Sequence, residues 1–183
     1  MTPTHPRGLL LALAGLMTLT ALTPPTGVAA PSRHPSEAAE LVGQIAKHRS
    51  RAWHWQRVMG ARRTPTRLAE RWTTSLDELR ALRDRWRTRA IGARTRAKHP
   101  PHRAAWSCIQ RYEGRWNDPG APYYGGLQMD LAFQRRYGRY LLRLKGPANR
   151  WTRLEQVWTA EKALRAGRGF YPWPAAASRC GLI

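Results

Sequence analysis

Residues 98–103, with the sequence Lys-His-Pro-Pro-His-Arg, separate two stretches of different composition. Consecutive prolines stop helices and stiffen the chain. Arginine is abundant before this segment, whereas aromatic residues and glycines cluster after it. We therefore expect a linker at 98–103 between a basic extension, residues 31–97, and a compact C-terminal domain, residues 104–183.

The first thirty residues have the pattern of a secretory signal peptide, residues 1–30. Arg7 gives a basic start, an apolar run follows from Gly8 to Leu22, and small residues end at Val28-Ala29-Ala30. The run is short for a permanent membrane span, although an uncleaved anchor is the alternative. We expect a secreted protein, extracellular or associated with the cell wall.

The two cysteines, Cys108 and Cys180, both lie in the C-terminal domain. An even number of cysteines in an exported chain favours a disulfide, and two free buried thiols are the alternative. No group of His and Cys residues has the spacing of a metal site, so we expect neither a metal nor another cofactor.

The formal net charge of +21 favours anionic partners. Anionic wall polymers or a membrane surface, contacted through basic helices, are the candidates, and plain solvation of the arginines is the alternative. The export signal and the lack of a known DNA- or RNA-recognition motif argue against specific binding of nucleic acid. The oligomeric state is left open by the sequence.

The basic extension reads as two helices with apolar stripes at steps of three and four residues. Ser36 is placed to cap the first helix. Thr64-Pro65 is typical of the start of a second helix, and Ser75–Glu78 has the capping-box spacing of a later start. The simplest arrangement is a helical hairpin of two antiparallel helices joined near Arg63. The apolar positions are Leu41, Ile45, Ala52, Trp55 and Met59, then Leu68, Trp72, Leu76, Leu79, Leu82 and Trp86.

Helix signals recur in the C-terminal domain, which gives a mainly α fold class for the chain. A short helix is expected at 104–113, ended by a glycine. Asp130 is placed to cap a helix that extends to residue 137. The capping-box spacing of Thr152–Glu155 begins a further helix that ends near residue 167.

A metal-free hydrolase needs a carboxyl group that donates a proton. Four of the five carboxylates in the C-terminal domain have structural explanations, in a turn, at two helix starts and in a pair with Arg165. Glu113 has none, because its charge at a helix end opposes the helix dipole, and a carboxyl near aromatic residues stays protonated. Such a group is suited to protonating a glycosidic oxygen, and an exposed helix-end glutamate is the alternative. The other four are Asp118, Asp130, Glu155 and Glu161.

Several residues after Glu113 are suited to binding sugar. Aromatic faces stack on sugar rings, glycines let a chain pass close to the backbone, and an amide offers both donors and acceptors. A hairpin turn with core tyrosines is the alternative interpretation. The candidate substrate-binding residues are Trp116, Tyr123, Tyr124, Gly125, Gly126 and Gln128.

Two segments carry a resemblance to a known family. Glu113-Gly114-Arg115-Trp116, followed by Tyr123-Tyr124-Gly125-Gly126-Leu127-Gln128-Met129, resembles the transglycosylase-like domain of actinobacterial resuscitation-promoting factors in order and approximate spacing. The resemblance covers roughly residues 104–183 and leaves the basic extension unmatched. It implies a compact lysozyme-like domain whose catalytic acid is Glu113.

The resemblance also implies a substrate and a reaction. The family's glycan cleft includes the positions of Tyr124 and Gln128, with Tyr123, Gly125 and Gly126 shaping it. The substrate is peptidoglycan, cut at the β-1,4 bond between N-acetylmuramic acid and N-acetylglucosamine. In a lytic transglycosylase one carboxyl acts as acid and then as base, while the muramoyl 6-hydroxyl replaces the water used by a muramidase.

A non-catalytic wall-binding module is the alternative function, and it would use the same cleft and the same basic helices. The cleft would then hold glycan strands without cutting them, and the basic helices would hold anionic polymers. Substitution of Glu113 separates the two readings, because it abolishes cleavage and spares binding.

Overall fold

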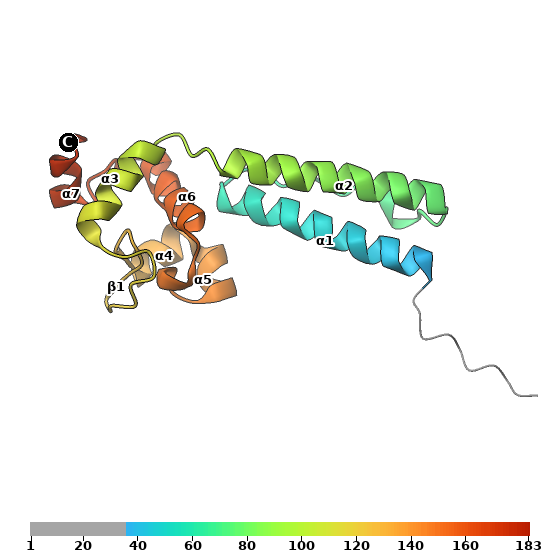
Figure 1. The fold of residues 1–183 in the computed structure, drawn as a ribbon, viewed down its shortest axis with the longest axis horizontal. Helices are drawn as coiled ribbons and strands as arrows, with labels where there is room; N and C mark the ends of the chain where they lie inside the picture. Colours follow the sequence, from blue (N-terminus) through green and yellow to red (C-terminus); the bar gives the residue numbers. More distant parts are fainter. Residues whose placement is uncertain (1–35) are drawn as a thin grey trace, which may run out of the picture. The chain divides into compact units, whose positions relative to one another are not determined.

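The computed structural model describes residues 36–183, so the predicted signal peptide, residues 1–30, lies outside the described residues. The described part is mainly helical, as the sequence predicts, and contains a short two-stranded sheet (Figure 1). The helices are α1 (Glu37–Val58), α2 (Leu76–Ala97), α3 (Arg103–Glu113), α4 (Leu131–Tyr137), α5 (Arg139–Lys145), α6 (Arg153–Ala163) and α7 (Pro174–Arg179). The strands are β1 (Tyr123–Tyr124) and β2 (Met129–Asp130), and the short helical turns are η1 (Leu68–Arg71), η2 (Ala148–Arg150) and η3 (Leu164–Arg168).

The predicted apolar stripe of α1 packs against α2. The Ser36 hydroxyl accepts a hydrogen bond from the Ala39 amide at 3.3 Å, so the predicted cap of α1 is confirmed. Indole rings of Trp53 and Trp86 meet edge to face, with centroids 5.9 Å apart. The buried residues between the two helices are Leu41, Ile45, Ala52, Leu79, Leu82, Trp86 and Ala90.

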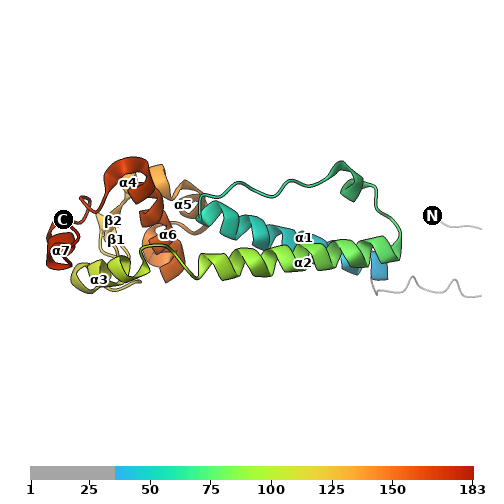
Figure 2. The same ribbon diagram turned by 90° about the horizontal axis from the view of Figure 1, so that it is seen from above.

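The two long helices run parallel, and the expected antiparallel hairpin is wrong. Both run in the same direction in Figures 1 and 2, with a long return segment between them. At their starts Glu37 pairs with Arg80. At their ends the Met59 carbonyl accepts from Arg165, and the Ala97 carbonyl accepts from the Trp158 indole at 2.8 Å.

Side-chain hydrogen bonds explain why the chain returns along α1 before α2 begins. Thr64 does not cap a helix; it exchanges two hydrogen bonds with the Gln56 amide, at 2.8 and 2.9 Å. Its carbonyl also accepts from the Trp53 indole at 2.8 Å. These bonds hold residues 61–66 extended beside α1, so the second helix starts only at Leu76.

The second predicted stripe is therefore only partly correct. Leu68 and Trp72 belong to the return segment, where they are 70% and 78% exposed. Glu70 in the same segment accepts a hydrogen bond from the Trp86 indole at 3.0 Å, which holds η1 against α2. Ser75 is the N-cap residue of α2, so the later helix start predicted at Ser75 is confirmed, but its side chain makes no capping hydrogen bond.

A second core lies among α3, α4, α5, α6 and α7 and includes Val58, Met59 and Ala97 from the ends of α1 and α2. The indole rings of Trp106 and Trp173 meet each other and nearby phenylalanine rings in tilted or edge-to-face pairs, an arrangement that adds to the burial of apolar area. The strands pair antiparallel, with Tyr123 opposite Asp130 and Tyr124 opposite Met129. The largest side chains of this second core are Trp106, Ile109, Leu127, Met129, Leu141, Trp151, Trp158 and Trp173.

The disulfide between Cys108 and Cys180 is confirmed, and it joins α3 to the end of α7 across 72 residues of sequence. The predicted helix caps at Asp130 and at Thr152 are also confirmed. The division of the chain at residues 98–103 stays a prediction, and the described residues lie in one compact unit. Within residues 36–183 no helix is long and apolar enough to cross a membrane.

Candidate functional site

Glu113 lies on the buried face of α3. Trp106 and Ile109 are both fully buried on that helix, and Glu113 follows them at steps of three and four residues, so its side chain lies on the same face. Burial raises the pKa of the Glu113 carboxyl, which is half-buried. Arg115, two residues further along, is exposed. A carboxyl of this kind holds its proton to higher pH than a solvated glutamate.

The amide of Gln128 lies beside the end of α3. Its Nε2 atom would be 2.9 Å from a Cβ on Gly114, the residue that follows Glu113. Both protons of this amide are used inside the loop, because Nε2 donates to the Asp118 carboxylate and to the Gly125 carbonyl, each at 3.0 Å. Gln128 therefore presents an acceptor oxygen to a ligand, rather than the donors and acceptors expected from its residue type.

The backbone of Gln128 has a φ of +45°, a conformation that side chains other than glycine rarely adopt. Its amide nitrogen donates to the Gly125 carbonyl at 3.0 Å, and its side chain is held at the same carbonyl. Strained residues held by several hydrogen bonds cluster at functional sites, which favours a functional role for this loop.

Gly125 and Gly126 are buried against other side chains. A Cβ on Gly125 would lie 2.5 Å from the Gln156 amide oxygen, and one on Gly126 would lie 2.9 Å from the Trp116 ring. The Gly126 amide donates to Gln156 at 2.9 Å, and Gln156 donates to the Trp116 carbonyl at 2.7 Å. The two glycines thus position the loop that carries Gln128.

Gln128 also lines a pocket. It has a volume of about 240 Å³, and Tyr123, Gln128 and Trp173 line it together with Asp130, Phe133 and Arg168. Tyr123 is 51% exposed, so its ring is free to contact a ligand, whereas Tyr124 is half-buried against the core. A ligand in this pocket would meet the Tyr123 ring and the Gln128 side chain, whereas Glu113 is not among the residues that line it.

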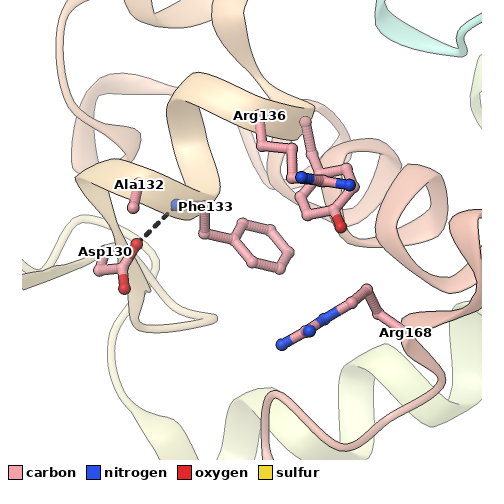
Figure 3. A pocket seen from close by; sticks show the side chains of 6 residues that line it. Asp130, Ala132, Phe133, Arg136 and Arg168 are labelled. Carbon is pink, nitrogen blue, oxygen red and sulfur yellow. Dashed lines mark hydrogen bonds between the residues drawn. The ribbon is translucent and has the colours of Figure 1, made fainter.

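An adjoining pocket of about 340 Å³ shares Asp130, Phe133 and Arg168 with the first, and the two neighbouring pockets are together called the groove. Figure 3 shows the Arg168 side chain reaching into this pocket near Phe133, while the Asp130 carboxylate is bonded to the Phe133 amide. Arg136 lies over the Tyr137 ring at 5.6 Å. This end of the groove carries two guanidinium groups.

Three of the four carboxylates given structural explanations behave as expected. Asp118 accepts from the Gly120 amide at 3.0 Å in the predicted turn, and Asp130 accepts from Phe133 at the start of α4. Glu155 completes the capping box with Thr152 and also binds Lys145 and His54.

Glu161 is the exception. Its carboxylate does not pair with Arg165, which donates to two backbone carbonyls, those of Glu161 and Met59. Its buried carboxylate accepts from the Trp106 indole at 2.9 Å and from the His102 amide at 2.8 Å, and it lies 3.1 Å from His102 Nδ1. The prediction failed because it used helical spacing alone, whereas α3 supplies closer donors.

Two residues of the site were missed from the sequence. Asp118 fixes the Gln128 amide as well as its own turn, and Gln156 joins the glycine pair to Trp116. Gln156 lies mid-helix without a motif, so no sequence signal pointed to it. The Asx-turn pattern at Asp118 was visible and explained the residue without reference to Gln128.

Within residues 36–183 no group of three or more His, Cys, Asp or Glu side chains is placed to hold a metal ion. Comparisons of the chain with protein-family models, with curated proteins and with solved structures gave no match.

Proposed function

We propose that the chain is an exported glycosidase with a lysozyme-like C-terminal domain that cleaves peptidoglycan. The bond cut is the β-1,4 bond between N-acetylmuramic acid and N-acetylglucosamine. One observation carries the proposal: a half-buried carboxyl with a raised pKa, Glu113, ends a helix beside the amide of Gln128. The resemblance of residues 113–129 to resuscitation-promoting factors supports the same assignment.

Glu113 acts first as an acid. Its burial keeps the proton available for the glycosidic oxygen as the bond to the departing N-acetylglucosamine breaks. The resulting carboxylate then takes a proton from the incoming nucleophile. A single carboxyl is sufficient when the muramoyl 6-hydroxyl attacks, since no water has to be activated by a second group.

The groove next to Gln128 holds the glycan. Tyr123 offers an exposed ring to a sugar face, and Gln128 offers its amide oxygen to a hydroxyl or acetamido N–H. Asp118 is a positioning residue, because its carboxylate fixes which way the Gln128 amide points.

The deciding experiment compares the mature protein and its Glu113→Gln variant on purified peptidoglycan, with released muropeptides analysed by mass spectrometry. We expect anhydro-muropeptides from the unmodified protein and a loss of about a hundredfold or more in the variant. Reducing-end products that are lost in the variant would mean a muramidase. No release by either protein, with both sedimenting with the wall, would replace the proposal by a non-catalytic wall-binding module.

A further inference from the structure

A cationic groove runs between the parallel helices α1 and α2. Both helices precede residues 98–103 in the sequence, whereas Glu113 follows them. The volume of the groove is about 450 Å³. The α1 wall carries His48, Arg51 and Trp55 at steps of three and four, and the α2 wall carries Arg87, Ala90, Ile91 and Arg94. Because the helices are parallel, the two rows advance together along the groove.

The positive charges of this groove are only partly offset by the protein, since Asp84 interacts with Arg87 and His48 but does not line the groove. The ion pairs of α1 and α2 lie elsewhere, at Arg80 with Glu37 and Asp77 and at Arg83 with Asp84. Within the described residues, Arg51, Arg87 and Arg94 make no salt bridge, and no carboxylate lines the groove. Burial, together with the Arg51 and Arg87 guanidiniums, lowers the pKa of His48, as expected where cations are crowded.

The shape of the groove favours a linear ligand. Arg87 and Arg94 are seven residues apart on one helix, which places them about 10 Å apart along its axis. A row of arginines of this length inside a groove matches an extended chain that carries repeated anionic groups. A flat bilayer would instead contact the convex outer faces of the helices. Guanidinium groups bind phosphate oxygens in pairs, which favours phosphate as the repeated group.

We propose that this groove binds a linear polymer that carries phosphate groups, independently of the Glu113 site. Single-stranded nucleic acid shares the phosphate chemistry but relies on successive aromatic platforms for its bases. The groove has one aromatic residue, Trp55, whose ring meets the neighbouring His54 ring at 5.0 Å. The polymer is therefore recognised through its phosphates, and it tethers the protein while the C-terminal domain acts.

A matched pair of double variants tests the groove against the overall positive charge. Arg87→Ala with Arg94→Ala removes two groove arginines. Arg85→Ala with Arg96→Ala removes two exposed arginines of the same helix, each about 200° around the axis from a groove position. Both variants lose the same charge, and neither touches α3. Circular dichroism of each variant checks that the helices are retained.

Long-chain inorganic polyphosphate is the probe, with affinity measured by calorimetry at about 0.15 M salt. We expect the groove variant to weaken binding about tenfold and the control variant about twofold or less. Equal loss in both variants would overturn the proposal in favour of diffuse charge. Tighter binding of oligo(dT) than of polyphosphate, lost in the groove variant, would replace it by nucleic acid. Groove-dependent binding of anionic phospholipid vesicles without polyphosphate binding would replace it by a membrane.

Discussion

Glu113 and Gln128 show how the protein sets the chemistry of single side chains. The helix that buries Ile109 also carries Glu113 toward the core, and burial raises the pKa of its carboxyl. The amide of Gln128 is fixed by Asp118 and by the Gly125 carbonyl, so only its oxygen is left for a ligand. Residue type suggested both roles, but the protonation and the direction of the amide come from neighbours that are distant in sequence.

The raised pKa of Glu113 predicts a pH-dependent effect on stability. A glutamate whose pKa is raised by folding stabilises the folded state only below its unfolded pKa, and this contribution is lost as the pH rises through the folded pKa. Glu113→Gln removes the ionisation penalty, so we expect a higher Tm than that of the unmodified protein at pH 7 and no difference near pH 3. Thermal unfolding at the two pH values measures this.

Glu78→Gln is the control, because Glu78 is an exposed carboxylate in the first turn of α2, where a negative charge is favourable. Its substitution lowers the Tm at pH 7, the opposite sign. A Tm change for Glu113→Gln that is the same at both pH values would contradict a buried, ionisable Glu113.

At the scale of elements, the β1–β2 turn is a rigid support for the site. Its two glycines allow the loop to approach Gln156 and Trp116 more closely than any side chain would permit. Gln156 satisfies the buried Gly126 amide and the Trp116 carbonyl together. From the sequence, we expect these glycines to let a glycan chain pass close to the backbone, whereas the structure places protein side chains there. Their role in glycan binding stays a prediction.

Gly125→Ala tests this support. We expect it to reduce the free energy of unfolding by about 3 kcal/mol, because the new Cβ meets Gln156 and Gly125 has a φ of +74°. Gly181→Ala is the matched control: its φ is +65° and nothing lies within 4 Å of a Cβ there, so strain alone costs about 1 kcal/mol. Urea unfolding measures the free energy of unfolding of both variants. Equal losses would show that the Gln156 side chain moves aside at little cost.

At the scale of the whole molecule, Glu155 joins three helices. Its carboxylate lies 2.7 Å from Lys145 of α5 and 3.1 Å from His54 of α1, and His54 also contacts Tyr140. Burial alone would raise the pKa of Glu155, but the hydrogen bonds from His54 and Lys145 outweigh it and lower the pKa to about 2. The basic extension and the C-terminal domain are thereby held together by a buried charge cluster.

Acid unfolding should follow from this cluster. A carboxyl whose pKa is depressed by folding stabilises the protein above its unfolded pKa, and the stabilisation is lost as the pH falls toward the folded pKa of about 2. We expect Glu155→Gln to cost about 3 kcal/mol at pH 7 and much less at pH 2, measured by urea unfolding. A loss that is equal at pH 7 and pH 2 would assign the effect to packing alone.

The local features of this protein follow from short stretches of sequence. Caps at Ser36, Asp130 and Thr152 follow from side chains that bond to amides three residues away, so they need no distant partner. The mainly helical class followed from apolar spacing, and the disulfide from two cysteines in one chain. Glu113 was singled out because it lacked any local explanation.

How these elements meet depends on contacts between residues that are distant in sequence. Apolar stripes are the same whether two helices run parallel or antiparallel, and the choice was made by bonds from Gln56 and Trp53 to Thr64. The same choice aligned the arginines of α1 and α2 along one groove. Glu161 found its partners on α3 for a related reason, since a buried carboxylate is stabilised by the nearest donors in space, whatever their separation in sequence.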